Sequence, residues 1–288
     1  MEPLSIGDLL DELAIVIAKP GVPPARSLAR DLIAGVLEQP PFWPSAHLGR
    51  ALTPDESSRI RAAAERLSEG MPMQYALGHV GFRHLTLQVD RRVLIPRPET
   101  ELLVDLVIAA QRGGKGTVVD VGTGSGAIAL SLAAEAGFDE IIAIDLSADA
   151  LAVARANLAA IPEERRSRVT FLQGDLLAPI QGRRVEVVVS NPPYISRAEA
   201  RELPALVHDW EPHLALFADD DGMAVIRALV PQAADALVAG GLLALEVDSR
   251  RADLAAALVT ADGRFTDVEQ RLDLTGRPRM VVARRQEL

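Results

Sequence analysis

Residues 117–126 read TVVDVGTGSG, an apolar strand pattern that runs directly into three glycines at alternate positions. A helical pattern follows at Ile128–Ala136. A strand, a glycine-rich turn and a helix in this order are typical of an open α/β sheet, in which ligands bind beyond the carboxyl ends of the strands. Glycines at that place let the backbone approach a ligand closely. The stretch therefore predicts both a fold class and a ligand site.

The same alternation of strand and helix continues to the end of the chain. It predicts an α/β fold with a doubly wound, mostly parallel sheet of seven strands and helices on both faces. The predicted parallel strands are Val118–Val121, Ile141–Ile144, Val169–Leu172, Val185–Ser190 and Leu242–Val247, and Phe265–Arg271 and Arg279–Ala283 are expected as an antiparallel edge. The further predicted helices are Ala148–Ala159, Met223–Ala239 and Ala252–Val259.

Ahead of this region the pattern differs. Residues 1–76 show helical spacing, and capping-box pairs stand at Ser5 with Asp8 and at Thr53 with Glu56. Residues 77–97 include apolar positions that alternate with polar ones, which favours a strand pair. We expect a helical-bundle domain over 1–76, a β-hairpin connector over 77–97 and the α/β domain over 98–288.

Composition excludes several classes of protein. The chain has 288 residues, a net charge of -10 and no cysteine, so disulfides and thiolate metal sites are ruled out. The five histidines show no pair at ligand spacing, and no metal is expected. The acidic balance disfavours broad nucleic-acid binding, which depends on Lys and Arg. No apolar run has the length of a membrane span, and we expect a cytoplasmic protein.

The glycine loop does not by itself identify the ligand that it binds. Its spacing is G-x-G-x-G, whereas the dinucleotide fingerprint is G-x-G-x-x-G or ends in alanine, which Ala127 would satisfy. Asp145 ends the next strand and suits a ribose hydroxyl pair or a helix cap. Asp175 suits an adenine amino group, with Leu176 near the ring, or a plain turn. Nicotinamide and S-adenosyl cofactors both carry a ribose.

The segment Asn191-Pro192-Pro193-Tyr194 after the fourth strand carries the most chemical information. Two prolines fix the backbone, so the Pro192 carbonyl is a stiffly placed acceptor beside the Asn191 carboxamide. A planar -NH2 group can donate one hydrogen to each acceptor and stack on Tyr194. This arrangement suits methylation of an amide or amino nitrogen, and a rigid surface turn is the other reading.

The loop at residues 120–126 together with Asn191–Tyr194 resembles class I S-adenosylmethionine methyltransferases that act on amide or amino nitrogens. Residues 75–78, YALG, and 93–103, VLIPRPETELL, narrow the resemblance to the peptide-release-factor glutamine N5-methyltransferases. The chain departs from the pattern of that family at Ala218–Asp220 and at Asp248–Arg250. The resemblance implies a Rossmann-like fold and transfer of a methyl group to the glutamine in the Gly-Gly-Gln loop of class 1 release factors.

The resemblance also implies roles for individual residues. The cofactor, S-adenosyl-L-methionine, would contact Gly122, Thr123, Gly124, Ser125, Gly126, Asp145, Leu176 and Asn191, with Asp175 added from its strand end. The substrate glutamine would be held by Asn191, Pro192, Pro193 and Tyr194, of which Asn191, Pro192 and Tyr194 are the expected catalytic residues. Residues 95–100 would close over the site. Arg97 and Glu99 would orient the substrate, or form a salt bridge at a helix start.

Three other functions compete with this one. A glutamine methyltransferase of a ribosomal protein shares Asn-Pro-Pro-Tyr, but a different run is expected there at residues 95–100. An adenine amino-methyltransferase can grip a flipped base with the same segment, and the acidic composition disfavours it. A nicotinamide-dependent oxidoreductase is disfavoured, because residues 191–194 have no role in hydride transfer. A module that only senses an adenosyl ligand would bind the cofactor without turnover, and a binding test with turnover separates it.

Overall fold

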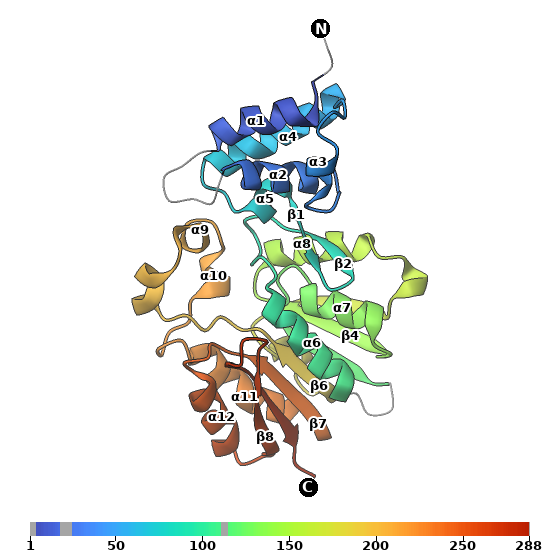
Figure 1. Cartoon of the computed structure of the whole chain (residues 1–288). Coiled ribbons are helices and arrows are strands. Elements are labelled where there is room, and N and C mark those ends of the chain that lie inside the picture. Colours follow the sequence, from blue (N-terminus) through green and yellow to red (C-terminus); the bar gives the residue numbers. More distant parts are fainter. Residues whose placement is uncertain (1–3, 18–24, 111–114, 288) are drawn as a thin grey trace. The chain divides into compact units, whose positions relative to one another are not determined.

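The computed structural model describes residues 4–17, 25–110 and 115–287 (Figure 1). The chain divides into two compact units. The first consists of Met1–His79 with Ala205–Trp210, and the second of Val80–Pro204 with Glu211–Leu288.

The first unit is helical. Its helices are α1 (Ile6–Val16), α2 (Ala25–Val36), α3 (Trp43–Ala46), α4 (Pro54–Ser68), α5 (Met73–Leu77) and α9 (Ala205–His208). Ser5 with Asp8 caps α1, and Thr53 with Glu56 caps α4, so both predicted capping boxes are confirmed. Apolar residues at helical spacing, among them Leu9, Leu32 and Ile60, are buried together in one core.

The second unit contains a seven-stranded sheet in the order β5-β4-β3-β6-β7-β9-β8. Its strands are β3 (Thr117–Val121), β4 (Glu140–Asp145), β5 (Arg168–Gln173), β6 (Val185–Ser190), β7 (Leu237–Glu246), β8 (Phe265–Leu272) and β9 (Pro278–Arg285). β3 to β7 pair in parallel, and β9 pairs antiparallel with both β7 and β8, as predicted. A separate hairpin joins β1 (His79–Phe82) and β2 (Leu85–Gln88).

Helices cover both faces of this sheet (Figure 1). Successive strand residues face opposite ways, so Val118 belongs to the core under α6 and α7, whereas Val119 belongs to the core under α11 and α12. The α-helices of this unit are α6 (Pro98–Ala110), α7 (Ala127–Glu135), α8 (Ala148–Ala159), α10 (His213–Leu216), α11 (Ala224–Ala236) and α12 (Ala252–Ala261). The 3-10 segments are η1 (Glu163–Arg165), η2 (Ala178–Ile180) and η3 (Arg197–Glu202).

One predicted boundary was wrong. Helix α11 ends at Ala236, three residues before the predicted Ala239, and β7 begins at Leu237 instead of Leu242. Leu237 pairs with Val185, and the register then shifts so that Leu242 pairs with Val187. The pair Gly240 and Gly241 absorbs this irregularity, with Gly240 at φ +74°. Glycines within a strand mark such a bulge, and their presence hid the first half of the strand.

The strand order reverses around β3, which has β4 on one side and β6 on the other. Connections leave in opposite directions from such a point, and a crevice opens beyond the strand ends. The glycine loop follows β3, and Asn191 follows β6. The fold thus places the two most informative sequence segments next to the same crevice.

Candidate functional site

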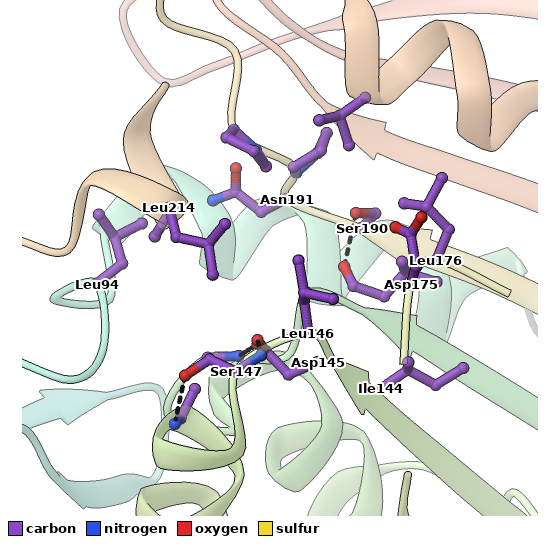
Figure 2. Close-up of a pocket in the computed structure, with 18 of the residues that line it drawn as sticks. Leu94, Ile144, Asp145, Leu146, Ser147, Asp175, Leu176, Ser190, Asn191 and Leu214 are labelled. Carbon is purple, nitrogen blue, oxygen red and sulfur yellow. Dashed lines mark hydrogen bonds between the residues drawn. The ribbon is translucent and has the colours of Figure 1, made fainter. Parts of the chain in front are cut away.

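A cavity of about 370 Å³ lies beyond the carboxyl ends of β3, β4, β5 and β6. Eight of the predicted site residues line it: Gly122, Gly124, Asp145, Asp175, Leu176, Asn191, Pro192 and Pro193. Figure 2 shows Asn191 and Asp145 on opposite sides of this cavity, with Leu146 between them. Thr123, Ser125, Gly126, Tyr194, Arg97 and Glu99 are not among the lining residues.

The glycine loop is held by its backbone. The N–H groups of Gly122 and Thr123 both donate to the carbonyl of Ile144, at 2.8 and 3.0 Å. Gly122 and Gly124 have φ values of +74° and +56°, and a Cβ at either position would meet no atom within 4 Å. Left-handed backbone, rather than crowding by protein atoms, therefore requires glycine here. Open space next to this backbone is what a closely bound ligand needs.

Thr123 turns its side chain away from the cavity. Its Oγ1 donates to Oδ2 of the buried Asp120 at 2.6 Å, and the N–H of Ala129 donates to the same oxygen at 3.2 Å. Ser125 is buried, and its carbonyl accepts from Asn157. The remaining glycine, Gly126, is the N-cap residue just before α7. These three residues shape the loop, and any contact of theirs with a cofactor stays a prediction.

Asp145 connects the loop to the following helix. Its Oδ2 accepts from the Gly124 N–H at 2.8 Å and its Oδ1 from the Ser147 N–H at 2.9 Å. The side-chain cap of α8 is Ser147, whose hydroxyl accepts from the N–H of Ala150. The helix cap that the sequence allowed for Asp145 is therefore made by Ser147. Burial raises the pKa of the Asp145 carboxyl above its ordinary value, and hydrogen bonds from a ligand would offset that cost.

Asp145→Ala is expected to weaken S-adenosylmethionine binding about 10- to 100-fold, because hydrogen bonds to a charged group contribute about 1.5–3 kcal/mol. Isothermal titration calorimetry measures the change. Asp139→Ala is a matched control, since Asp139 also accepts a glycine N–H, that of Gly116, but just before β4 begins. Unchanged affinity in Asp145→Ala would remove the ribose role.

The segment after β6 is anchored on both sides. Ser190 Oγ donates to the carbonyl of Val121 at 2.7 Å, which joins the end of β6 to the end of β3. The half-buried Asn191 donates from Nδ2 to Thr100 Oγ1 at 3.1 Å. Pro192 is buried and Pro193 is half-buried. These contacts fix one hydrogen of the Asn191 carboxamide on the side of α6.

Tyr194 lies among charged groups outside the cavity lining. Burial, and then the neighbouring carboxylate of Glu246, raise the pKa of its phenol further above the ordinary value, while Arg279 opposes them. The raised pKa favours the protonated hydroxyl, which is a poor base. Its role as a stacking face for the substrate stays a prediction.

Arg97 is engaged by another carboxylate. Its Nη2 contacts Oε1 of the buried Glu211 at 2.5 Å, and Glu211 Oε2 also accepts from the N–H of Ile95 at 3.3 Å. Glu211 thereby ties residues 95–97 to the residues just before α10. Glu99 is half-buried on the first turn of α6. Substrate contacts of Arg97 and Glu99 stay predictions.

Sequence reasoning missed several residues of the site. Three leucines, Leu94, Leu146 and Leu214, add apolar walls to the cavity, and the last two are more than half exposed there. Glu246 ends β7 next to Asn191 and is buried. The strand-end rule that pointed to Asp145 would also have pointed to Glu246, whereas nothing in the sequence indicates the leucines.

The cavity fits an adenosyl cofactor. Its volume lies within the usual range for small-molecule sites, and apolar walls with few polar groups are typical of them. Gly122 and Gly124 leave room for a close approach, Asp145 can accept from two ribose hydroxyls, and Leu146 and Leu176 can flank a flat ring. Within the described residues, no group of three or more His, Asp or Glu side chains is arranged to hold a metal ion.

Two buried carboxyls predict how stability depends on pH. Burial raises the pKa values of Asp120 and Glu246 from 3.8 and 4.5 to about 7 each. Between those limits the folded protein holds protons that the unfolded chain has released, so stability falls as pH rises. Thermal unfolding should therefore have a higher midpoint at about pH 5.5 than at about pH 8. Calorimetry of the double variant Asp120→Asn, Glu246→Gln should show a flatter dependence; an unchanged one would contradict the assignment.

Comparison of folds agrees with the architecture. A methyltransferase from Pyrococcus furiosus superposes with a TM-score of 0.53 at 14% identity, over 82% of this chain and all of that one. The ribosomal protein L11 methylase from Lactobacillus delbrueckii subsp. bulgaricus gives 0.50 at 19% identity, over 73% and 99%. A glycine loop, a strand-end aspartate and the Asn-Pro-Pro segment around one cavity on this sheet define an S-adenosylmethionine-dependent methyltransferase.

Sequence comparison specifies the family. Residues 98–209 match the methyltransferase small domain and residues 8–78 match the PrmC N-terminal domain. The release factor glutamine methyltransferase of Deinococcus radiodurans is 41% identical over 98% of this chain and 99% of its own length. That of Mycolicibacterium smegmatis is 43% identical over 78% of both chains. The chain belongs to the release factor glutamine methyltransferase family.

No helix among the described residues is long and apolar enough to cross a membrane.

Proposed function

We propose that this chain transfers the methyl group of S-adenosyl-L-methionine to the side-chain amide nitrogen, N5, of the glutamine in the Gly-Gly-Gln loop of class 1 peptide chain release factors. The observation that carries the proposal is the placement of Asn191 and Pro192 in the wall of the cofactor cavity. Family membership over almost the whole chain supports the same substrate.

When bound, S-adenosyl-L-methionine would supply an electrophilic methyl carbon on a sulfonium, with S-adenosyl-L-homocysteine as the leaving group that keeps the electron pair of the broken bond. The residues of the chain orient the glutamine amide nitrogen, which accepts the methyl group. An amide lone pair is delocalised, so the nitrogen must be held in line with the methyl group. The Asn191 Oδ1 and the Pro192 carbonyl each accept one hydrogen of the glutamine -NH2.

These two acceptors also favour the transition state. As the new N–C bond forms, the nitrogen becomes positive and its hydrogens become more acidic, so both hydrogen bonds strengthen. The nitrogen then loses one proton to solvent, and no strong base is needed before attack. The protonated Tyr194 is consistent with a role in stacking instead of proton transfer.

A division of labour between the parts of the chain completes the proposal. Residues 1–76 would recognise the release factor, residues 77–97 would connect the two parts, and residues 98–288 would carry out the transfer. The match to a family-specific N-terminal domain at 8–78 supports a recognition role for this segment. We propose that the reaction takes place in the cytoplasm and needs no direct contact with nucleic acid.

The test uses labelled S-adenosylmethionine with two acceptors, an intact class 1 release factor and the same factor with its Gly-Gly-Gln glutamine replaced by alanine. Label on the intact factor alone is the expected result. Label on both would move the methylated residue elsewhere in the partner. Label on neither, together with label on added nucleic acid or on ribosomal protein, would overturn the substrate while leaving a methyltransferase.

A further inference from the structure

Glu246 lies beside Asn191 because of the sheet register. Ser190 at the end of β6 pairs with Leu245 of β7, so the next residues of the two parallel strands, Asn191 and Glu246, are neighbours. The Glu246 side chain is 1% exposed. Its Oε2 is buried and has no hydrogen-bond partner within the part of the chain that the structure describes. Burying a carboxylate oxygen without a hydrogen-bond partner costs stability, which suggests that Glu246 has a function at the site.

Thr100 links the two side chains. The Asn191 Nδ2 donates to Thr100 Oγ1 at 3.1 Å, which leaves the Thr100 hydroxyl hydrogen free to point elsewhere. Thr100 is buried on the first turn of α6, and both Thr100 and Asn191 lower the pKa of the nearby Glu246 carboxyl, which means that they favour its charged form. The Asn191 amide thus donates to Thr100, and the Thr100 hydroxyl hydrogen is available to a carboxylate that can only accept.

We propose that Glu246 is a positioning residue, which acts with Thr100 to hold the -NH2 of Asn191 away from the cavity and its Oδ1 toward the methyl-acceptor glutamine. This inference rests on the proposed function. A carboxylate accepts hydrogen bonds and donates none, so it stabilises only one of the two orientations of the neighbouring carboxamide. The reversed carboxamide would present two donors to a substrate -NH2 that also donates.

The charge state of Glu246 then matters for catalysis. Burial raises its pKa to about 7, opposed by Thr100, Arg279 and Asn191 and reinforced by Glu99. The pKa of the neighbouring Tyr194 is raised by burial and by Glu246 and Asp248, and it is lowered by Arg279 and Arg97. The net effect favours the protonated phenol. A protonated Glu246 can donate to Thr100, whose own hydrogen can then turn to Asn191 and favour the reversed amide. Turnover should fall as pH drops through about 7.

The decisive variants change hydrogen-bond direction and preserve shape. Glu246→Gln introduces an -NH2 donor in place of a carboxylate oxygen. Thr100→Val removes the linking hydroxyl, whereas Thr100→Ser keeps it. We expect the first two to lower kcat about 10-fold or more, because a misoriented group loses most of its contribution, with KM for the release factor and Kd for S-adenosylmethionine nearly unchanged. Thr100→Ser should recover most of the turnover, and Glu246→Gln should lack the acid limb of the wild-type pH profile.

Glu140→Gln is the matched control. Glu140 is a largely buried glutamate that accepts a hydrogen bond from the Thr170 hydroxyl at 3.1 Å. It is the first residue of β4 and therefore lies at the amino ends of the parallel strands, away from the cavity. Its kcat should stay at the wild-type value. Thermal unfolding of every variant separates loss of positioning from loss of fold.

The outcomes separate the two proposals. If the wild-type protein labels no release factor, the proposed function fails. If the wild-type protein labels the glutamine but Glu246→Gln keeps its kcat and its acid limb, the positioning role is overturned and the function stands. The positioning role is equally overturned if Glu140→Gln loses as much turnover, or if the loss in Glu246→Gln appears in KM or Kd instead of kcat.

Discussion

Asn191→Ala should lower methyl transfer by about 100-fold or more, because it removes an acceptor whose interaction strengthens in the transition state. The substitution also removes the hydrogen bond to Thr100, but it leaves the glycine loop and Asp145 in place. Affinity for S-adenosylmethionine should therefore weaken only modestly. Single-turnover transfer to a release factor, measured beside calorimetric cofactor binding, separates the two effects.

Tyr194→Ala serves as a comparison for this variant, since it removes the predicted stacking face and keeps both acceptors. Its loss of turnover should be smaller than that of Asn191→Ala. Near-normal transfer by Asn191→Ala would show that the amide nitrogen is not gripped as proposed, whatever the identity of the acceptor protein.

Gly222→Ala should cost about 2–5 kcal/mol of unfolding free energy and most of the transfer activity, since left-handed strain adds to a steric collision. Gly222 has φ +86° and follows two further residues with positive φ, Asp220 and Asp221. An added Cβ would collide with the carbonyl oxygen of Tyr194 and lie 2.6 Å from Arg251 Nε. The backbone of the Asn-Pro-Pro-Tyr segment would have to shift.

Arg251 makes this collision costly. Its Nε donates to the carbonyl of Asp221 at 2.6 Å and its Nη2 contacts Glu199 Oε2 at 2.5 Å, so the arginine has little freedom to move. Gly263→Ala is the matched control, because Gly263 has φ +76° but a Cβ there would meet no atom within 4 Å. Urea unfolding should show a loss of about 1–2 kcal/mol for the control. Equal losses in both variants would mean that strain alone, without contact to Tyr194, explains the effect.

Periodicity was sufficient to predict the sheet. The parallel strands read as short apolar runs, and those inside the sheet are buried on both faces. Val185–Ser190 was therefore placed to the residue, and β3, β4 and β5 to within one residue at each end. The start of β7 was missed because its first half contains Gly240 and Gly241 in a bulge. The strand propensity of residues 237–241 cannot predict such a shift in register, because the shift depends on how β7 pairs with β6.

The site was predictable where a residue ends its strand or lies within two residues of the strand end. Gly122, Asp145, Asp175 and Asn191 stand at strand ends, and the parallel topology brings them to one cavity. Contacts between segments far apart in the chain were not predictable. Glu211 meets Arg97 across 114 positions, and Arg251 meets Glu199 across 52. Charge and spacing carry no information about such pairs without the fold.

The hydrogen bond from Ser190 to Val121 joins the strand that leads into the glycine loop to the strand that leads into Asn191. If the proposed function holds, the sheet would set the distance between methyl donor and acceptor, and the shape of each incoming protein would not. A change of preferred partner would leave these strands unaltered. It would have to arise away from Asn191 and its partners, for example in the helices over residues 25–76 that are proposed to recognise the release factor.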